Sequence, residues 1–228
     1  MLRNVLAPIH PDGWRFIAIA AAVTLLLFWL AEPLGWIGVV LTLWCAYFFR
    51  DPWRVTPTRA GLVIAPADGV VVSIGPAKPP QDLGMDEMPM TRIGIFLNVF
   101  DVHVNRMPMA GRVLKLAYHA GKFFNASLDK ASEQNERMAI RLAATEGADI
   151  AVVQIAGLVA RRIVCTLTEG QEVMAGQRFG LIRFGSRTDV YVPASWTPFA
   201  VTGQRVIGGE TVIADSRAQE PARQGIEH

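Results

Sequence analysis

The sequence contains a single Gly-Ser dipeptide, Gly185-Ser186, in the segment GLIRFGSRTDVYVP between two runs with the composition of β-strands. A serine hydroxyl can attack the carbonyl group that precedes it and form an ester, provided that the turn is strained and a base removes the proton. Glycine leaves that carbonyl uncrowded and permits unusual backbone angles. Elimination would then leave a dehydroalanine that hydrolyses to a pyruvoyl group. The alternative is an ordinary hairpin turn, in which Gly and Ser are common.

His103, in the segment FDVHVNRMP, is a second candidate for chemistry. In one continuous strand, side chains alternate between two faces, so Asp101, His103 and Asn105 would share the face of Leu97 and Val99. A polar cluster at the end of an apolar strand face is typical of a site on a rigid element. Histidine is also the usual proton shuttle near neutral pH. The alternative is a half-buried histidine that only bonds Asp101.

Two further polar residues have both a structural and a functional interpretation. Asp68 lies in the segment 66–69, Pro-Ala-Asp-Gly, which is good turn chemistry and needs no function to explain it. His119 lies in a polar, turn-like setting beside Gly121 and Lys122. It could bind a phosphate or assist His103, or it could be an ordinary histidine of a surface loop.

Several classes of function are disfavoured by composition. The net charge of +2 gives no reason to expect nucleic acid as a partner. No spacing of His, Cys, Asp and Glu matches a metal site, and no Walker-type phosphate loop is present. Cys45 and Cys165 are expected to be packing residues in a reducing compartment. The lysines are Lys78, Lys115, Lys122 and Lys130, none of them placed to carry biotin or lipoate.

The N-terminal part is strongly apolar. Residues 16–31 and 34–49 carry no charge and are separated only by Glu32-Pro33. A 16-residue helix is about 24 Å long against a hydrocarbon core of about 30 Å, so the two runs together predict a helical hairpin embedded in the bilayer. A cleaved signal peptide and a buried helical pair in a soluble core are the alternatives. The flanking arginines place both ends in the cytoplasm by the positive-inside rule: Arg3, Arg15, Arg50 and Arg54.

After the hairpin, the pattern changes to short alternating runs punctuated by glycine and proline, which predicts a β-rich domain. The expected strands are 62–65, 69–74, 92–104, 111–116, 138–143, 150–155 and 161–166. The composition of residues 216–228 is typical of a disordered end. The expected fold class is therefore mainly β (α+β), with a membrane anchor over 1–54, a β domain over 55–215 and a tail over 216–228.

One internal repeat is visible. GQEVMAG from Gly170 and GQRVIGG from Gly203 share the spacing G-x-x-V-x-x-G. This spacing resembles the hairpins of barrel-sandwich hybrid domains, in which glycines supply the positive φ of tight turns. Two copies are too few for a solenoid, and we expect two hairpins packed in one sandwich.

Six motifs in one order resemble the phosphatidylserine decarboxylase family, particularly its short proenzyme form. They are APADG, FDVHVNRMP, YHAGKF, NER, QIAG-x-x-ARRI and RFGSRTDVYVP. The resemblance runs from about Asp51 to Ala214 and implies a pyruvoyl-dependent lyase made as an inactive precursor. Ser186 would attack the Gly185 carbonyl, separating a β chain, 1–185, from an α chain, 186–228, that begins with the pyruvoyl group.

The resemblance also implies roles for the other candidate residues. Asp68 matches the acidic member of the family's self-cleavage triad, and His103 matches the first histidine of an H-x-x-H-x-P-like stretch. The sequence departs from the family pattern at Arg106, which stands where longer members place a second histidine. His103 is therefore the favoured base of the triad and His119 the reserve. His103 is also the expected donor of the proton that returns to the substrate after CO2 leaves.

The implied reaction is decarboxylation of phosphatidylserine to phosphatidylethanolamine and CO2, with the pyruvoyl ketone serving as electron sink. The hairpin would hold the site at the cytoplasmic face of the cell membrane, where a diacyl lipid can be reached. Two alternatives stay open: a non-catalytic membrane-anchored adaptor, and a decarboxylase of a related lipid such as archaetidylserine. A homo-oligomer is compatible with the sequence, which does not fix the oligomeric state.

Overall fold

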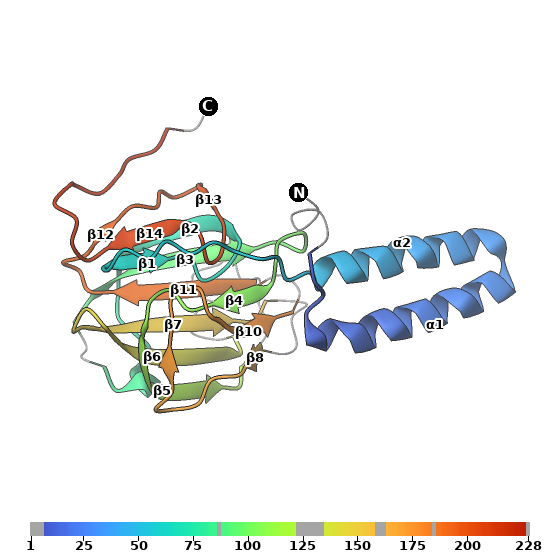
Figure 1. The fold of residues 1–228 in the computed structure, drawn as a ribbon, viewed down its shortest axis with the longest axis horizontal. Helices are drawn as coiled ribbons and strands as arrows, with labels where there is room; N and C mark the ends of the chain where they lie inside the picture. The colour runs from blue at the N-terminus through green and yellow to red at the C-terminus, as the bar shows by residue number, and fades with distance from the viewer. Residues whose placement is uncertain (1–6, 86–87, 122–134, 158–162, 184–185, 227–228) are drawn as a thin grey trace.

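The structure, a computed structural model, describes residues 7–85, 88–121, 135–157, 163–183 and 186–226. A pair of antiparallel helices projects from one end of a β domain (Figure 1). The β domain consists of strands from residue 62 onward, and both helices precede them in the sequence. This arrangement agrees with the expected class, mainly β with an N-terminal helical hairpin.

The helical hairpin comprises a short 3-10 helix, η2 (Pro11–Gly13), and two α-helices, α1 (Trp14–Leu30) and α2 (Glu32–Phe48). The helices approach closely because small residues lie between them: a Cβ on Gly35 would stand 2.0 Å from the Phe28 ring. Threonines 24 and 42 meet across the interface, with 3.0 Å between their hydroxyl oxygens. Small residues and hydroxyl contacts are typical of helix pairs in membranes.

The outer surface of the hairpin is apolar. Trp29 is 85% exposed and Leu25 71%. Among the described residues, the segment Pro11–Leu30 is long and apolar enough to cross a membrane, whereas Glu32–Phe48 is shorter. An exposed apolar surface of this extent favours lipid or another apolar partner around the helices.

In the described part of the chain, three antiparallel sheets form the β domain. The largest has eight strands in the order β13-β2-β3-β11-β7-β6-β5-β9, and two three-stranded sheets have the orders β1-β14-β12 and β4-β10-β8. A 3-10 helix, η3 (Gln81–Leu83), precedes β3. The strands are β1 (Leu62–Ile64), β2 (Gly69–Ala77), β3 (Met90–Leu97), β4 (Val104–Arg106), β5 (Gly111–His119), β6 (Arg137–Ala144), β7 (Asp149–Ile155), β8 (Ile163–Cys165), β9 (Glu172–Val173), β10 (Arg178–Ile182), β11 (Ser186–Val192), β12 (Thr197–Pro198), β13 (Arg205–Val206) and β14 (Val212–Asp215).

The expectation of one continuous strand over 92–104 is wrong. The chain leaves β3 at Leu97 and re-enters a different sheet as β4 at Val104. Two side chains stabilise the turn between them: Asn98 Oδ1 accepts from the Phe100 amide at 2.8 Å, and Asp101 Oδ2 accepts from the Asn98 amide at 2.9 Å. Asn and Asp commonly form such local bonds, which compete with the ladder of a strand.

The repeat predicted from the glycine spacing is confirmed as a pair of equivalent turns. The Gly170 amide donates to the Val113 carbonyl at 2.7 Å, and the Gly203 amide donates to the Val71 carbonyl at 2.8 Å. The short strands that follow, β9 and β13, are the two edges of the eight-stranded sheet. All four repeat glycines have positive φ: Gly170 86°, Gly176 75°, Gly203 89° and Gly209 82°.

The end of α2 packs into the β domain. Phe48 and Phe49 are each 1% exposed and form a cluster with Val102, Val104 and Leu181. The hairpin is therefore joined to the domain through the segment around β4 and the end of β10. A second, larger core cluster fills the space between the sheets.

Substituting alanine for two of the repeat glycines should separate backbone strain from a clash. A Cβ on Gly176 would stand 2.0 Å from the Thr56 hydroxyl and 2.9 Å from its Cβ, whereas nothing lies within 4 Å of a Cβ on Gly203. Gly203→Ala should lower the free energy of unfolding by about 1 kcal/mol, the penalty for positive φ. Gly176→Ala should lower it by roughly 2 to 4 kcal/mol. Urea unfolding of both variants measures the difference, and equal losses would contradict this account.

Candidate active site

Ser186 is the first residue of β11, a strand hydrogen-bonded on both sides, to β3 and to β7. Its cross-strand partner on β3 is Leu97. The side chain is fully buried, and among the described residues its hydroxyl has no hydrogen-bond partner. Gly185, the other half of the predicted scission point, lies outside the described residues.

The direction of the Ser186 side chain follows from the alternation along β11. Val190 and Val192 belong to the main core cluster between the sheets. Ser186 and Thr188 share their parity in the strand and therefore point to the same side. The serine hydroxyl thus lies at one end of the apolar core layer.

His103 immediately precedes β4, in a different sheet from β11. Its ring packs on Phe48, which clusters with Val102, Val104 and Leu181. The His103 carbonyl also accepts from the amide of Ile182, the last residue of β10, at 3.3 Å. Ile182 is four positions before the predicted nucleophile, so the His103 backbone contacts the strand that precedes Ser186 in the sequence.

The tautomer of His103 follows from its one hydrogen bond. The ring Nδ1 lies 2.9 Å from the carbonyl oxygen of Asp101, and a carbonyl can only accept. Nδ1 therefore carries the proton, and Nε2 presents a bare lone pair that has no partner among the described residues. Burial lowers the pKa of His103 from 6.5 to about 4, so the ring is neutral at physiological pH. This is the state required of a proton acceptor.

Aromatic packing fixes the ring plane of His103. The Phe48 ring, at the end of α2, lies 4.3 Å from the imidazole, centroid to centroid, at an interplanar angle of 35°. The hairpin therefore contacts the candidate base directly. The site lies at the end of the β domain from which the helices project (Figure 1).

Asp68, just before β2, is held by groups other than His103. One carboxylate oxygen accepts from Arg54 at 2.7 Å and the other from the Gly208 amide at 2.8 Å. Burial raises the pKa of Asp68, opposed by the Arg54 charge. The acceptor that orients His103 is the carbonyl of Asp101, so the predicted role of Asp68 in orienting the histidine is not visible in these contacts.

Asp101 supplies negative charge close to the histidine. Its carboxylate is fully buried and pairs with Arg205, which is itself 63% exposed. The second oxygen accepts from Asn98, in the turn after β3. Arg54 and Arg205 thus place positive charge at the rim of the site, against carboxylates deeper inside.

His119, the reserve candidate, is not brought to this site. It is exposed at the last position of β5. Across the sheet, His119 is paired with Arg137 of β6, which is paired with Ile155 of β7, which in turn is paired with Arg187 of β11. Three strand spacings of about 4.8 Å therefore separate it from β11, roughly 14 Å. The neighbouring Lys122 lies outside the described residues.

Arg106, which replaces the second histidine of longer family members, has a structural set of partners. Its guanidinium bonds Asp51 at 3.1 Å, the Pro52 carbonyl at 3.0 Å and the Gly176 carbonyl at 3.1 Å. It is 6% exposed and ties the segment after the hairpin to the β domain. A guanidinium cannot serve as a general base at neutral pH.

Sequence reasoning left two polar residues of this layer unassigned, Gln154 and Thr188. They are paired across β7 and β11, and both are fully buried. The available signal was a polar residue on the face that each strand shares with apolar ones: Gln154 with Val152 in β7, and Thr188 with Val190 and Val192 in β11. Such a residue is informative because buried polar groups require partners.

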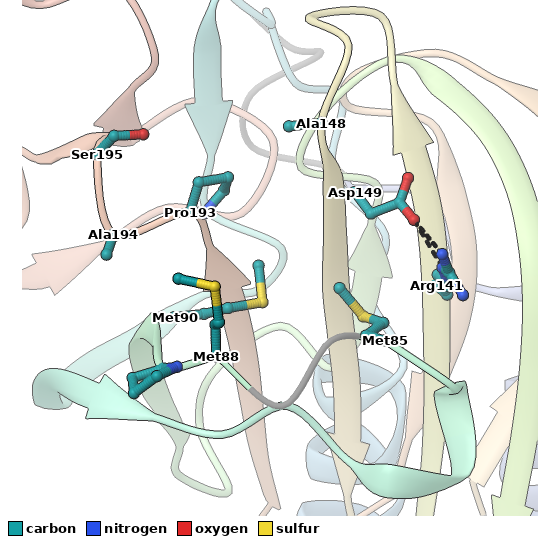
Figure 2. Close-up of a pocket in the computed structure, with 10 residues that line it drawn as sticks. Met85, Met88, Met90, Arg141, Ala148, Asp149, Pro193, Ala194 and Ser195 are labelled. Carbon is teal, nitrogen blue, oxygen red and sulfur yellow. Dashed lines mark hydrogen bonds and ion pairs between the residues drawn. The ribbon is translucent and has the colours of Figure 1, made fainter.

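A pocket of about 450 Å³ lies elsewhere, at the other end of β11. Figure 2 shows its methionines, Met85, Met88 and Met90, with the ion pair of Arg141 and Asp149 nearby. Its residues 193–195 directly follow Val192, the last residue of β11. The length of that strand, about 20 Å, separates this pocket from Ser186.

Comparison with known proteins identifies the family. A model of the phosphatidylserine decarboxylase family matches residues 41–214. The chain belongs to this family. Relatives named phosphatidylserine decarboxylase proenzyme include one from Cereibacter sphaeroides, 58% identical over 99% of this chain and 97% of its own. Another, from Paramagnetospirillum magneticum, is 57% identical over 96% of this chain and 91% of its own, and one from Ruegeria pomeroyi is 57% identical over 94% and 98%.

The match to the phosphatidylserine decarboxylase family covers every candidate residue of the site. It begins within α2 and ends at Ala214, the third residue of β14. The relative from Cereibacter sphaeroides that is named a proenzyme aligns with this chain over nearly the whole length of both. The family resemblance inferred from six short motifs is therefore confirmed.

The low pKa of His103 predicts how stability depends on pH. Between pH 6.5 and about 4 the unfolded chain carries a proton on this residue that the folded chain does not, so acidification through this window favours unfolding. The loss should be on the order of 3 kcal/mol in a Ser186→Ala chain. Urea unfolding at several pH values measures it. His103→Gln should flatten the slope and His119→Gln should not; a slope unchanged by His103→Gln would contradict the burial argument.

Proposed function

We propose that this chain decarboxylates phosphatidylserine to phosphatidylethanolamine and CO2, after converting its own Ser186 into a pyruvoyl group. The observation that carries the proposal is that a fully buried serine hydroxyl and a fully buried, neutral imidazole nitrogen both lack a partner among the described residues, while the His103 carbonyl bonds the amide of Ile182, four positions before Ser186. The names of the relatives support the reaction. The residue roles that follow are part of the proposal.

In the first step, His103 Nε2 accepts the proton of Ser186 as its oxygen attacks the carbonyl of Gly185. The bond between that carbonyl carbon and the Ser186 nitrogen then breaks, and the proton passes from Nε2 to the nitrogen, which becomes a free amine. The carbonyl of Asp101 holds the proton on Nδ1, so only Nε2 can act. Asp68 supports the step electrostatically from its position between Arg54 and Gly208. A base with a low pKa is a weak acceptor, but a buried one is shielded from bulk solvent.

The position of residue 186 suits a pyruvoyl group. The backbone of β11 from Arg187 onward is paired with both β3 and β7, so a chain that begins at residue 186 would keep its place after scission. When formed there, such a group supplies a ketone that takes up the substrate amine and accepts the electrons released with CO2. His103 is the residue that we assign to return a proton to the substrate.

The α chain, 186–228, would remain bound to the β chain, 1–185. Each of its main strands pairs with a strand of the β chain: β11 with β3 and β7, β13 with β2, and β14 with β1. Separation would require the eight-stranded sheet to open. The division of the chain into an anchor over 1–54, a catalytic domain over 55–215 and a tail over 216–228 belongs to the same proposal.

The apolar hairpin supports a lipid substrate. Phe48 contacts His103 at the base of the hairpin, so a bilayer around the helices would bring headgroups to the site. Phe100, in the turn beside the site, is 60% exposed, and Arg50 donates to its carbonyl at 2.7 Å. Aromatic and arginine side chains are common at the membrane interface. We place the site at the cytoplasmic face of the cell membrane.

Ser186→Ala tests the proposal directly. The unsubstituted chain should run on a denaturing gel as two polypeptides, and intact mass should show the smaller one blocked by a ketone at residue 186. The alanine variant lacks the attacking oxygen and should stay whole and inactive. If the unsubstituted chain stays whole and still releases CO2 from phosphatidylserine, the pyruvoyl part of the proposal is wrong.

The two histidines should behave differently. His103→Ala should slow scission at least a hundredfold, the usual contribution of a general base. His119→Ala should leave scission and activity within about twofold, since an exposed strand end lies outside the site. Time courses of the two bands on a gel, with both variants at equal folded content by circular dichroism, measure this. Normal scission in His103→Ala would refute its assignment.

A further inference from the structure

Five buried polar atoms around Ser186 have no protein partner among the described residues. They are His103 Nε2, Asn105 Nδ2, Gln154 Oε1, Ser186 Oγ and Thr188 Oγ1. All five residues are 0% exposed. A buried polar atom without a partner lowers stability by about 1 to 3 kcal/mol, so five would offset much of a domain's stability of about 5 to 15 kcal/mol. Something other than the described side chains must satisfy them.

These atoms belong to one layer. Thr188 and Gln154 are cross-strand partners, and Gln154 Nε2 donates to Asn105 Oδ1 at 2.7 Å, which joins the large sheet to β4. Ser186 is two residues from Thr188 and on the same side of β11, and His103 is two residues before Asn105, directly ahead of β4. The absence of a side chain at Gly180 leaves room for the glutamine amide, since a Cβ there would stand 3.0 Å from Gln154 Nε2.

The orientation of the two amides is determined by a backbone carbonyl. Gln154 Nε2 lies 3.4 Å from the Val164 oxygen, which can only accept, so the nitrogen must be on that side. Gln154 Oε1 is then left as an acceptor and Asn105 Nδ2 as a donor, and the Thr188 hydroxyl can act as either. These three groups are uncharged, and together they offer both a hydrogen-bond donor and an acceptor.

The combination of unpartnered donors and acceptors determines which kind of ligand fits the site. A carboxylate requires donors and an ammonium requires acceptors, whereas water both donates and accepts. Buried water makes two to four hydrogen bonds to groups of this kind. The uncleaved chain must also fold before any lipid can react at residue 186, so the occupant at that stage is available to every folding chain. These points favour water over a substrate headgroup.

We propose that Asn105, Gln154 and Thr188 form a buried water site beside Ser186, and that its water is consumed in making the ketone. The inference rests on the proposed function of Ser186. In the elimination from the ester, His103 takes the Cα proton of residue 186, the bond between Ser186 Oγ and Cβ breaks, Gly185 is released as a carboxylate, and a double bond forms between Cα and Cβ. A proton shift from nitrogen to Cβ gives a methyl group and a C=N bond. Water adds its oxygen to Cα, and ammonia leaves.

Burial gives the site its importance. Ser186, Arg187 and Thr188 are each at most 1% exposed, so these described residues offer bulk solvent no open path to the C=N bond. A held water is already next to the reacting carbon and needs no opening of the sheet. Loss of its partners should therefore slow this hydrolysis without slowing the earlier ester step.

The test uses Thr188→Val in the full-length chain, with Thr166→Val as matched control because the Thr166 hydroxyl already has a partner, the Phe179 carbonyl at 3.1 Å. Chains made in a cell-free system are quenched at intervals with sodium borohydride. Reduction turns the nitrogen form into an N-terminal alanine and the ketone into a lactyl group. Mass spectrometry separates the two, and Edman sequencing reads only the alanine form.

We expect Thr188→Val to split at the control rate but to accumulate the alanine-terminated α chain, with ketone formation slowed about tenfold. Ketone formation at the control rate would overturn the proposal, and so would equal slowing of scission itself, which would place the cluster in the ester step. An unsubstituted chain that never splits would refute the proposed function, and the water site with it.

A crystal structure of the Ser186→Ala chain provides a second measurement that does not depend on the folding of Thr188→Val. This chain keeps all three proposed water partners. An ordered water within hydrogen-bond distance of Thr188 Oγ1 and Asn105 Nδ2 would support the site. Side chains that bond one another, with no water between them, would refute it.

Discussion

The placement of β11 between β3 and β7 is the constraint on which the rest of the structure depends. A strand paired on both sides holds its backbone by two ladders, and here they extend over Ser186–Val192 and Arg187–Tyr191. Cutting the chain before such a strand removes one covalent bond but no ladder bond. A protein that breaks its own backbone can therefore retain its fold when the cut lies at the start of a central strand. The proposed scission point satisfies this condition.

The same geometry explains why the proposed reacting groups are neutral while charges lie around them. His103 and Ser186 are fully buried, where an isolated charge would be strongly disfavoured. The carboxylates of Asp68 and Asp101 each have an arginine partner, Arg54 and Arg205. Charge is thus available close to the imidazole without being placed beside it. A neutral acceptor shielded from bulk solvent, with paired charges nearby, suits the proposed transient transfer of a single proton.

The sequence predicted the hairpin, the β-rich class and the repeat because each rests on local periodicity or on glycine backbone freedom. It failed at 92–104, where alternation continued through a turn that Asn98 and Asp101 stabilise by side-chain bonds. The sequence indicated Ser186 and His103 as candidate catalytic residues. It did not indicate that His119 lies at a distant strand end, because the order of strands in a sheet depends on long-range pairing. Gln154 and Thr188 were missed for the same reason: their polarity is informative only once both are known to face the layer that contains the nucleophile.

The hairpin and the site are coupled through Phe48 rather than merely joined in sequence. Phe48 ends α2, stacks on the His103 ring and belongs to the same cluster as Leu181 of β10. Tilting the helices relative to the domain would move this ring and with it the plane of the imidazole. A close-packed contact transmits such shifts because the interior has little free volume. The orientation of the helices relative to the β domain thus bears on the geometry of the proposed proton transfer, because the hairpin ends directly beside the candidate base.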